Sequence, residues 1–182
     1  PNMTVICPAD YNQTKQATLA IANHIGPVYL RFGRPSWPVF IPNDMPFQIG
    51  KAQLMVKGSD VTIVATGHLV WKALLAAEIL SEKGISATVI NMHTIKPLDT
   101  EAVIRSVKET GCVVTAEEHQ RNGGLGEAVA QILATHNPAP MEMVAVNDTF
   151  GESGTPDQLL VKYGLDAPDI VSKCLDVIAR KN

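Results

Sequence analysis

The sequence is poor in aromatic residues and in cysteine. Only 5% of its 182 residues are Phe, Trp or Tyr, so Val, Ile, Leu and Ala must supply most of the core. The three cysteines, Cys7, Cys112 and Cys174, lie far apart and lack the spacing of a zinc site. Cys7 and Cys112 stand in strand-like runs, where a thiol packs as a small apolar group. We therefore expect reduced thiols and neither a disulfide framework nor a metal cluster.

Long apolar runs and a strong net charge are also missing. No run reaches the roughly 18 apolar residues that a membrane-spanning helix needs, and no signal-peptide pattern is present. The formal net charge of −3 argues against nucleic acid or an anionic membrane surface as the main partner. With 46% hydrophobic and 18% charged residues, the composition is that of a soluble globular protein, which we expect in the cytoplasm.

The beginning of the chain is typical of a fragment. The first residue is Pro1, and a strand-like run starts almost at once. The pattern predicts a strand over 4–7, a helix over about 13–23, capped by Asp10 or Asn12, and a strand over 28–31. One βαβ unit is too small to bury both faces of its strands. We interpret it as the end of a larger sheet whose upstream part is missing.

Prolines interrupt the next segment, from Phe32 to Gly50, at positions 35, 38, 42 and 46. Proline removes the backbone donors that helices and sheets need, so the segment reads as an extended linker at a domain boundary. Beyond it the chain alternates between the two regular structures. Strands are predicted over 52–56, 61–65, 87–91, 112–116 and 141–146, and helices over 69–83, 99–108 with Asp99 as cap, 125–134, 156–163 and 168–180. Such alternation implies a mostly parallel sheet covered on both faces.

A polar, glycine-rich turn follows the strand over 112–116. Gly123, Gly124 and Gly126 precede a helix, whose free N–H groups could hold an anion. Gly124, Gly126 and Val129, with Asp148 downstream, imitate a dinucleotide-binding fingerprint. However, Val129 stands where glycine or alanine belongs, and the turn lies several residues beyond the strand. We therefore favour a structural turn or a subunit contact over a nucleotide site.

Acidic residues and histidines near the turn suggest acid–base chemistry, but the pattern is weak. Glu117, Glu118 and His119 are adjacent, and neighbours on an extended segment point to opposite sides. A solvated or hydrogen-bonded turn explains them as well, and Glu118 could pair across a subunit interface. We expect His68 to help cap the helix that follows it. Lys96, before Pro97, is expected in a turn, and the other histidines lack the spacing of metal ligands.

Several segments resemble one family. The segments Thr-Ile-Lys-Pro-Leu-Asp at 94–99, the turn at 117–129, Ser-Gly-Thr-Pro-Asp-Gln-Leu-Leu at 153–160 and Tyr-Gly-Leu-Asp at 163–166 resemble the C-terminal domain of transketolases. Tyr-Leu-Arg-Phe-Gly-Arg-Pro at 29–35 resembles the end of their pyrimidine-binding domain. The resemblance implies a pyrimidine-binding remnant over 1–34, a linker over 35–50 and a C-terminal domain over 51–182. It also implies a three-layer α/β/α fold with a mostly parallel, mixed five-stranded sheet whose first strand is antiparallel, preceded by a βαβ remnant of a second parallel sheet.

The resemblance further implies an activity. Transketolases use thiamine diphosphate with Mg²⁺ or Ca²⁺ to transfer a two-carbon ketol unit between sugar phosphates, a reaction of the pentose phosphate pathway. Their active site lies between the subunits of a homodimer. The catalytic glutamate and the metal-binding motif belong to regions outside this chain, so we expect no catalytic residue, metal ligand or bound cofactor here, and no activity of the chain alone. The missing N-terminal part would be upstream on the same polypeptide or on a separate subunit.

Arg31 is the strongest candidate for a site residue. It ends a predicted strand at the carboxyl edge, where open sheets bind ligands. Its guanidinium can grip a phosphate with two parallel hydrogen bonds. The position resembles the family's arginine that holds the sugar-phosphate tail, although a strand-end arginine can instead pair with a local carboxylate. Glu118, Gly123, Gly124 and Gly126 form the candidate interface or anion-binding turn.

Two other interpretations of the chain stay open. It could be the equivalent part of a related thiamine-diphosphate enzyme, either a 2-oxo acid dehydrogenase β subunit or a deoxyxylulose-phosphate synthase. It could also be a non-catalytic module that binds a nucleotide through the glycine turn or serves oligomerisation.

Overall fold

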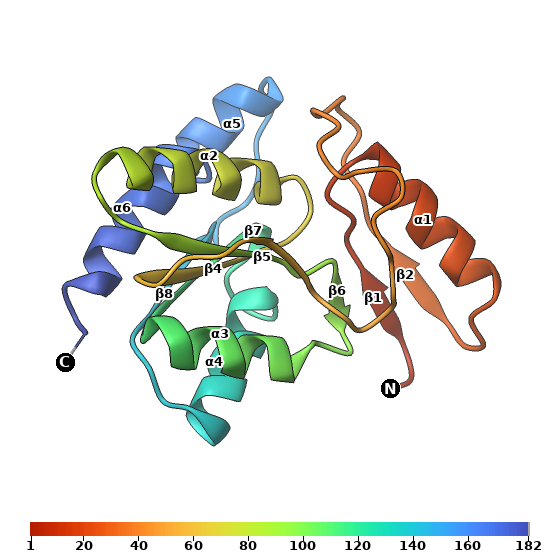
Figure 1. The fold of residues 1–182 in the computed structure, drawn as a ribbon. Coiled ribbons are helices and arrows are strands. Elements are labelled where there is room, and N and C mark those ends of the chain that lie inside the picture. The colour runs from red at the N-terminus through yellow and green to blue at the C-terminus, as the bar shows by residue number, and fades with distance from the viewer. Residues whose placement is uncertain (182) are drawn as a thin grey trace.

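Two β-sheets organise the chain (Figure 1). The structure is a computed structural model and describes residues 1–181. The strands are β1 (Thr4–Ile6), β2 (Val28–Leu30), β3 (Gln53–Val56), β4 (Val61–Ala65), β5 (Ala87–Asn91), β6 (Thr94–Lys96), β7 (Val113–Gln120) and β8 (Met141–Val146). The helices are α1 (Tyr11–Ala22), α2 (Leu69–Glu82), α3 (Thr100–Thr110), α4 (Leu125–His136), α5 (Pro156–Lys162) and α6 (Ala167–Ile178).

The larger sheet has five strands in the order β3-β5-β4-β7-β8. β3 runs antiparallel to β5, and the other neighbours are parallel. Every residue of the central strands β4 and β5 is buried. Their residues are mostly apolar, with Thr62, Thr88 and Asn91 as exceptions, and this fits the position, because strands covered on both faces do not alternate between apolar and polar residues. The expected mixed five-stranded sheet with an antiparallel first strand is confirmed.

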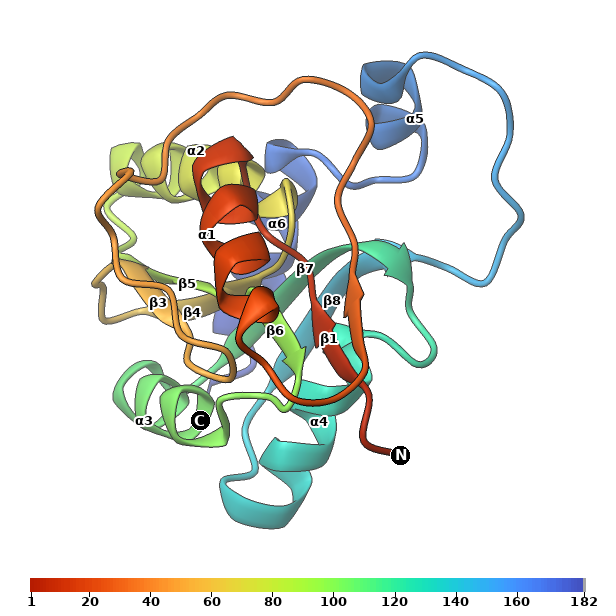
Figure 2. The same cartoon turned by 90° about the vertical axis from the view of Figure 1, so that its right-hand side faces the viewer.

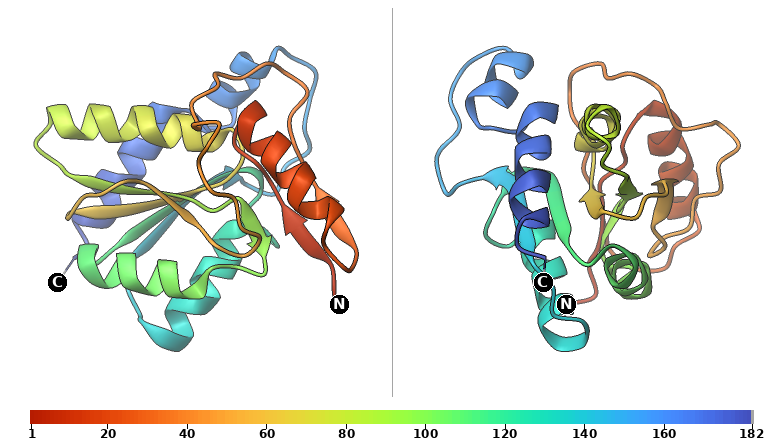
Figure 3. Two further views of the ribbon diagram at one scale, coloured as in Figure 1. Left: turned by 45° about the vertical axis from the view of Figure 1, so that its right-hand side comes forward. Right: turned by 60° about the vertical axis from the view of Figure 1, so that its left-hand side comes forward.

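Helices cover both faces of this sheet. α2 and α6 pack on one face, and α3 and α4 pack on the other (Figures 1 and 3). The two faces form separate cores, in which Ile63 of β4 packs with α2 and α6 while its neighbour Val64 packs with α3 and α4. Aliphatic side chains dominate both cores, as the scarcity of aromatic residues predicts. The three-layer α/β/α arrangement is thus confirmed.

The smaller sheet has the order β2-β1-β6 (Figure 2). β1 and β2 are parallel and flank α1 in the sequence, which confirms the expected βαβ unit. β6, however, pairs antiparallel with β1 and was not predicted. The expectation that Lys96 lies in a turn is therefore wrong. β6 has only three residues, and its strand conformation depends on a partner far away in the sequence, which local propensity does not report.

The proline-rich segment contains no helix or strand within residues 32–50. It is nevertheless fastened to α1. The Asp10 side chain accepts hydrogen bonds from the backbone N–H groups of Phe40 and Ile41 at 2.8 and 2.7 Å. Its other oxygen accepts from Gln13 N–H at 2.9 Å and so caps α1, as expected. One buried carboxylate therefore holds both the beginning of the helix and the segment that crosses it.

β7 is longer than the sequence indicates. It runs from Val113 to Gln120, whereas the apolar run ends at Ala116. Its polar second half stays in the sheet because Gln120 pairs with Val146 of β8 after a shift in register. Glu117 and Glu118 accordingly lie on a strand and not in a turn, and only Arg121 and Asn122 separate the end of the strand from Gly123.

Candidate functional site

Arg31 follows β2 at its carboxyl end, where Arg31 N–H donates to Ile6 O at 2.8 Å. Its guanidinium reaches the C-terminal end of β7. Nη2 donates to the backbone oxygen of Glu118 at 2.8 Å and lies 3.5 Å from Glu118 Oε2, while Nη1 lies 3.8 Å from Cys7 Sγ. The Arg31 side chain is 34% exposed. The guanidinium carries five N–H donors, so part of its binding capacity remains free for a ligand.

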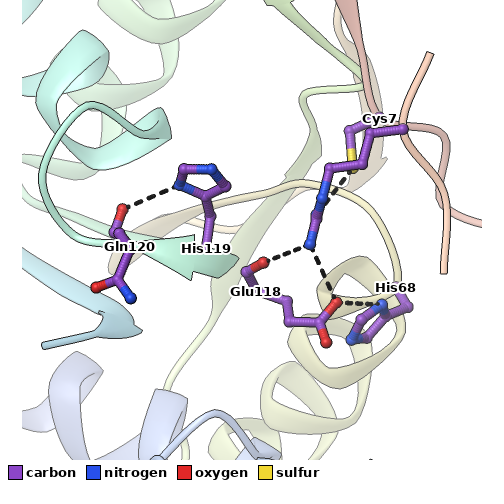
Figure 4. A network of polar contacts seen from close by, with 6 residues as sticks. Cys7, His68, Glu118, His119 and Gln120 are labelled. Carbon is purple, nitrogen blue, oxygen red and sulfur yellow. Dashed lines mark hydrogen bonds and ion pairs between the residues drawn. The ribbon is translucent and has the colours of Figure 1, made fainter. Parts of the chain in front are cut away.

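Glu118 connects Arg31 to His68. The Glu118 carboxylate points toward His68 (Figure 4), and its Oε2 lies 3.3 Å from His68 Nδ1. Burial, with the nearby charges of Arg31 and Lys72, lowers the pKa of His68 to about 4. His68 is therefore neutral near pH 7, so its 3.3 Å contact with the Glu118 carboxylate is a polar contact between a neutral ring and a carboxylate and not an ion pair. Burial also raises the pKa of Glu118, although the Arg31 charge acts in the opposite direction.

His68 does not have the role that the sequence suggests. It occupies the N-cap position of α2, but its side chain makes no capping hydrogen bond, so the expected capping role is wrong. Instead its ring stacks on Trp37, with the centroids 4.1 Å apart and the planes within 3° of parallel. The His68 side chain is 7% exposed. The stack fixes the ring plane, with Nδ1 on the side of Glu118.

Trp37 is a site residue that sequence reasoning did not identify. It comes from the proline-rich segment, which gives no periodic pattern to read. The only available signal was the presence of a Trp in a chain with few aromatic residues. Through the stack, this segment joins the ends of β2 and β7 and the beginning of α2 in one cluster, which consists of Arg31, Trp37, His68 and Glu118.

Two cavities meet at this cluster. One, of about 410 Å³, is lined by residues that include Cys7, Arg31, Trp37 and His68. The other, of about 420 Å³, shares Arg31, Trp37 and His68 and adds Glu118 and Arg34. Each volume falls in the range of small-molecule sites. The partly exposed Arg31 guanidinium lies at the wall of both cavities, so this edge of the molecule can bind an anionic ligand.

Glu117 points away from Glu118 and caps α4. Its carboxylate accepts hydrogen bonds from Leu125 N–H at 2.7 Å and from Gly126 N–H at 2.8 Å. The side chain is 2% exposed. Burial raises the pKa of Glu117, while the hydrogen bonds from the two amides lower it. The opposite directions of the two glutamates follow from their adjacent positions on a strand.

The glycine turn is shaped around this carboxylate. A Cβ atom on Gly124 would collide with the Glu117 carboxylate and with Gln120 O. Gly123 has a φ of +78°, which favours glycine, and its N–H donates to Glu127 Oε2 at 2.8 Å. The N–H groups of Gly123, Leu125 and Gly126 are thus bonded to carboxylates of the chain itself. An added anion would have to displace Glu117 from a buried position.

Other candidates, except Cys7 beside Arg31, stand outside this network. His119 lies apart from the cluster (Figure 4) and its Nδ1 is 3.3 Å from Gln120 O. Cys7, Cys112 and Cys174 are free and buried. No group of three or more His, Cys, Asp or Glu side chains within residues 1–181 is arranged to hold a metal ion. None of the helices in the described part of the chain has the length and apolar character needed to cross a membrane.

Comparison with known proteins identifies the family. The family model described as "Transketolase, C-terminal domain" matches residues 50–170. A 6-deoxy-6-sulfo-D-fructose transketolase subunit from Clostridium sp. (strain MSTE9) is 49% identical over 100% of this chain and 56% of its own length. A putative transketolase C-terminal section from Methanocaldococcus jannaschii is 43% identical over 100% of this chain and 57% of its own length.

A more distant relative and a solved structure complete the comparison. A 1-deoxy-D-xylulose-5-phosphate synthase from Geobacter sulfurreducens is 37% identical over 100% of this chain and 29% of its own length. A solved structure titled "Split gene transketolase, inactive beta4 tetramer" superposes with a TM-score of 0.97 at 46% identity, covering 100% of this chain and 60% of that one. The chain thus spans less than two thirds of these relatives, and it belongs to the transketolase family, with the family's C-terminal domain over residues 50–170.

Proposed function

We propose that this chain is the C-terminal part of a thiamine-diphosphate-dependent transketolase that transfers a two-carbon ketol unit between sugar phosphates. Family membership and the names of the relatives support the activity. In this proposal residues 1–34 complete a pyrimidine-binding domain, residues 35–50 link it to the next domain, and residues 51–182 form the C-terminal domain. The complete enzyme acts in the cytoplasm as a homodimer of its catalytic unit.

Arg31 binds the terminal phosphate of the sugar in this proposal. The observation that carries the assignment is a partly exposed guanidinium, held at the carboxyl end of β2, on the wall of two cavities. A hydrogen bond to a charged group contributes about 1.5–3 kcal/mol, so a bidentate contact can supply much of the affinity for a small substrate. The Clostridium relative is named for a sulfonated sugar, and a guanidinium binds a sulfonate through the same N–H groups.

The cofactor and its metal are assigned to the part of the enzyme outside this chain. A diphosphate-bound Mg²⁺ or Ca²⁺ needs several oxygen ligands. Within residues 1–181 no cluster of three or more potential ligand side chains is present, and the N–H groups of Gly123, Leu125 and Gly126 are engaged with Glu127 and Glu117. These residues do not fit the metal and the diphosphate, so their contribution to the reaction is limited to the substrate and to subunit contacts.

The missing N-terminal part is the required partner. The Clostridium relative is named as a subunit, and the superposed structure is titled as an inactive β4 tetramer of a split-gene transketolase. We therefore propose that this chain alone is inactive and that activity returns when the N-terminal part is supplied. Glu118, Gly123, Gly124 and Gly126 remain candidates for the contact surface, although Glu118 and the turn also have partners within the chain.

Kinetics of the complete enzyme test the role of Arg31. We expect Arg31→Ala to raise KM for phosphorylated substrates by about 10- to 100-fold, because the loss of a charge-assisted contact of about 1.5–3 kcal/mol corresponds to that change. The matched control is Arg105→Ala, which removes an exposed arginine from α3, away from both cavities. An unchanged KM in the Arg31→Ala enzyme would refute the assignment.

A deoxyxylulose-phosphate synthase is the second candidate, since one such enzyme is 37% identical to the chain. The two activities differ in the donor. A transketolase takes its two-carbon unit from a ketose phosphate, whereas the synthase uses pyruvate. Turnover of pyruvate with an aldose phosphate, and none with ketose phosphates, would favour the synthase. The greater identity to the transketolase subunit supports the first candidate.

A further inference from the structure

Arg31 is held by groups that the phosphate-binding role does not itself explain. Arginine has a long flexible side chain, and its planar fork recognises an anion only in the correct orientation. In this structure Nη2 contacts both the backbone oxygen and the carboxylate of Glu118, at 2.8 and 3.5 Å. Together with the 3.8 Å contact from Nη1 to Cys7 Sγ, these two contacts to Nη2 restrict rotation of the guanidinium plane.

The Glu118 carboxylate is itself restrained from the opposite side. The same Oε2 atom that faces Arg31 lies 3.3 Å from His68 Nδ1. His68 is buried, and its stack on Trp37 fixes the ring. The chain of contacts therefore runs from the Trp37–His68 stack through the Glu118 carboxylate to the Arg31 guanidinium. Each member belongs to a different segment, so the arrangement exists only when the two sheets are assembled.

We propose that Glu118 is a positioning residue for Arg31 and that His68 holds Glu118 in place. The inference rests on the proposed function, in which Arg31 binds the substrate's phosphate. Glu118 orients the guanidinium so that its remaining N–H groups face the cavities. The substrate then meets a preorganised donor pair and orders less of the protein on binding. The C-terminal domain thereby contributes to substrate affinity without touching the substrate.

A purely electrostatic role for Glu118 predicts the reverse effect. The carboxylate partly neutralises Arg31, and removing a negative charge near an anion site would strengthen phosphate binding. If positioning dominates, its removal weakens phosphate binding. The sign of the change in KM therefore separates the two roles, and a KM that falls in the Glu118→Ala enzyme overturns the proposal.

The experiment uses the complete enzyme with a phosphorylated ketose donor and with a ketose donor that lacks the phosphate. We expect Glu118→Ala to raise KM for the phosphorylated donor by about five- to tenfold, the change associated with about 1 kcal/mol of a partly exposed contact. kcat, and KM for the donor without phosphate, should stay within about twofold, because only the phosphate contact is disturbed. An unchanged KM for the phosphorylated donor overturns the proposal.

Substitution of His68 provides an independent measurement. Asn carries an amide N–H near the position of Nδ1, so His68→Asn can still donate to Glu118, whereas His68→Ala cannot. We expect His68→Ala to raise KM for the phosphorylated donor and His68→Asn to restore most of the affinity. Equal effects of the two variants would overturn the link between His68 and Glu118, even if Glu118→Ala failed to fold.

Combining the variants distinguishes failure of this inference from failure of the proposed function. If Glu118 acts through Arg31, then Glu118→Ala should have no further effect on KM in the Arg31→Ala enzyme. A raised KM in Arg31→Ala with no effect of Glu118→Ala overturns the positioning role and leaves the phosphate role of Arg31 intact. No effect of Arg31→Ala overturns both.

Discussion

The buried Glu117 carboxylate offers a sharp test of how α4 is attached to the sheet. We expect Glu117→Ala to lower the free energy of unfolding, because the N–H groups of Leu125 and Gly126 would lose their acceptors. An unpaired buried donor costs about 1–3 kcal/mol, so two of them predict a loss of about 2–4 kcal/mol, allowing for partial access of water. Urea denaturation of the chain, followed by circular dichroism, measures the change as a shift in midpoint at constant m.

Glu117→Gln should cost less than Glu117→Ala. The amide keeps one acceptor oxygen, and it removes a charge that the site disfavours, since burial raises the pKa of Glu117 above its ordinary value of 4.5. We expect the free energy of unfolding to fall by about 1–2 kcal/mol. This is the cost of one unpaired donor, made smaller because the variant no longer buries a charge. A loss below about 1 kcal/mol for Glu117→Ala, or equal losses for the two variants, would refute this account of the cap.

The raised pKa also predicts how the effect varies with pH. A carboxyl whose pKa is raised by folding binds more protons in the folded state than in the unfolded state between the two pKa values. Its contribution to stability therefore falls as pH rises through that window, above 4.5. Glu117→Gln lacks this term, so its destabilisation should be larger near pH 4.5 than at pH 7. A penalty that grows with pH would contradict the assigned direction.

Two further predictions concern the turn and a second buried histidine. Gly124→Ala should destabilise the chain by about 2–4 kcal/mol, because its Cβ would displace the Glu117 carboxylate. For the same reason its effect should add to that of Glu117→Ala by less than the sum of the two. Gly151→Ala, in open space, is the control and should leave the urea midpoint unchanged. Burial lowers the pKa of His93 from 6.5 to about 4. The unfolded chain therefore binds a proton at His93 before the folded chain does, and the free energy of unfolding should fall as pH falls from 6.5 to about 4, by on the order of 3 kcal/mol over the whole window. The pH dependence of unfolding should therefore be flatter between pH 4 and 6.5 for His93→Gln, and an unchanged slope would show that His93 does not titrate there.

Much of the fold could be predicted because it depends on local pattern. The mostly apolar runs of β4 and β5 indicate strands covered on both faces, and the caps at Asp10 and Asp99 mark the beginnings of α1 and α3. β6 and the polar half of β7 could not be predicted in this way. Both are strands only because a distant partner pairs with them, β1 for β6 and β8 for β7. A pattern of apolar residues therefore predicts β7 only as far as Ala116 and does not indicate β6.

The same limit applies to the candidate site. The place of Arg31 at the end of a strand and its resemblance to a family residue indicate a site residue. Neither signal predicts which residues contact its side chain. His68 was interpreted as a cap because it precedes a helix, whereas its ring is used for a stack on Trp37. Trp37 stands in a segment without periodicity. Contacts between segments that are far apart in sequence create the cluster, so no window of the sequence contains it.

Polar contacts join the two sheets beside the site. Gln13 Nε2 of α1 donates to Gln53 Oε1 of β3 at 2.6 Å, and Asn91 Nδ2 of β5 lies 3.1 Å from the side-chain oxygens of both glutamines. Cys7 N–H donates to His93 O at 2.8 Å beside the β1–β6 pairing.

Hydrogen bonds of this kind require one geometry, and a shifted arrangement would leave buried polar groups unpaired. These hydrogen bonds between the two sheets, the polar seam, therefore fix the end of β2 relative to the end of β7. Arg31 stands at the end of β2 and Glu118 near the end of β7, so the polar seam as a whole determines their 2.8 Å contact. Substitutions in this polar seam, although distant from both cavities, should weaken phosphate binding through the position of Arg31 before they unfold either sheet.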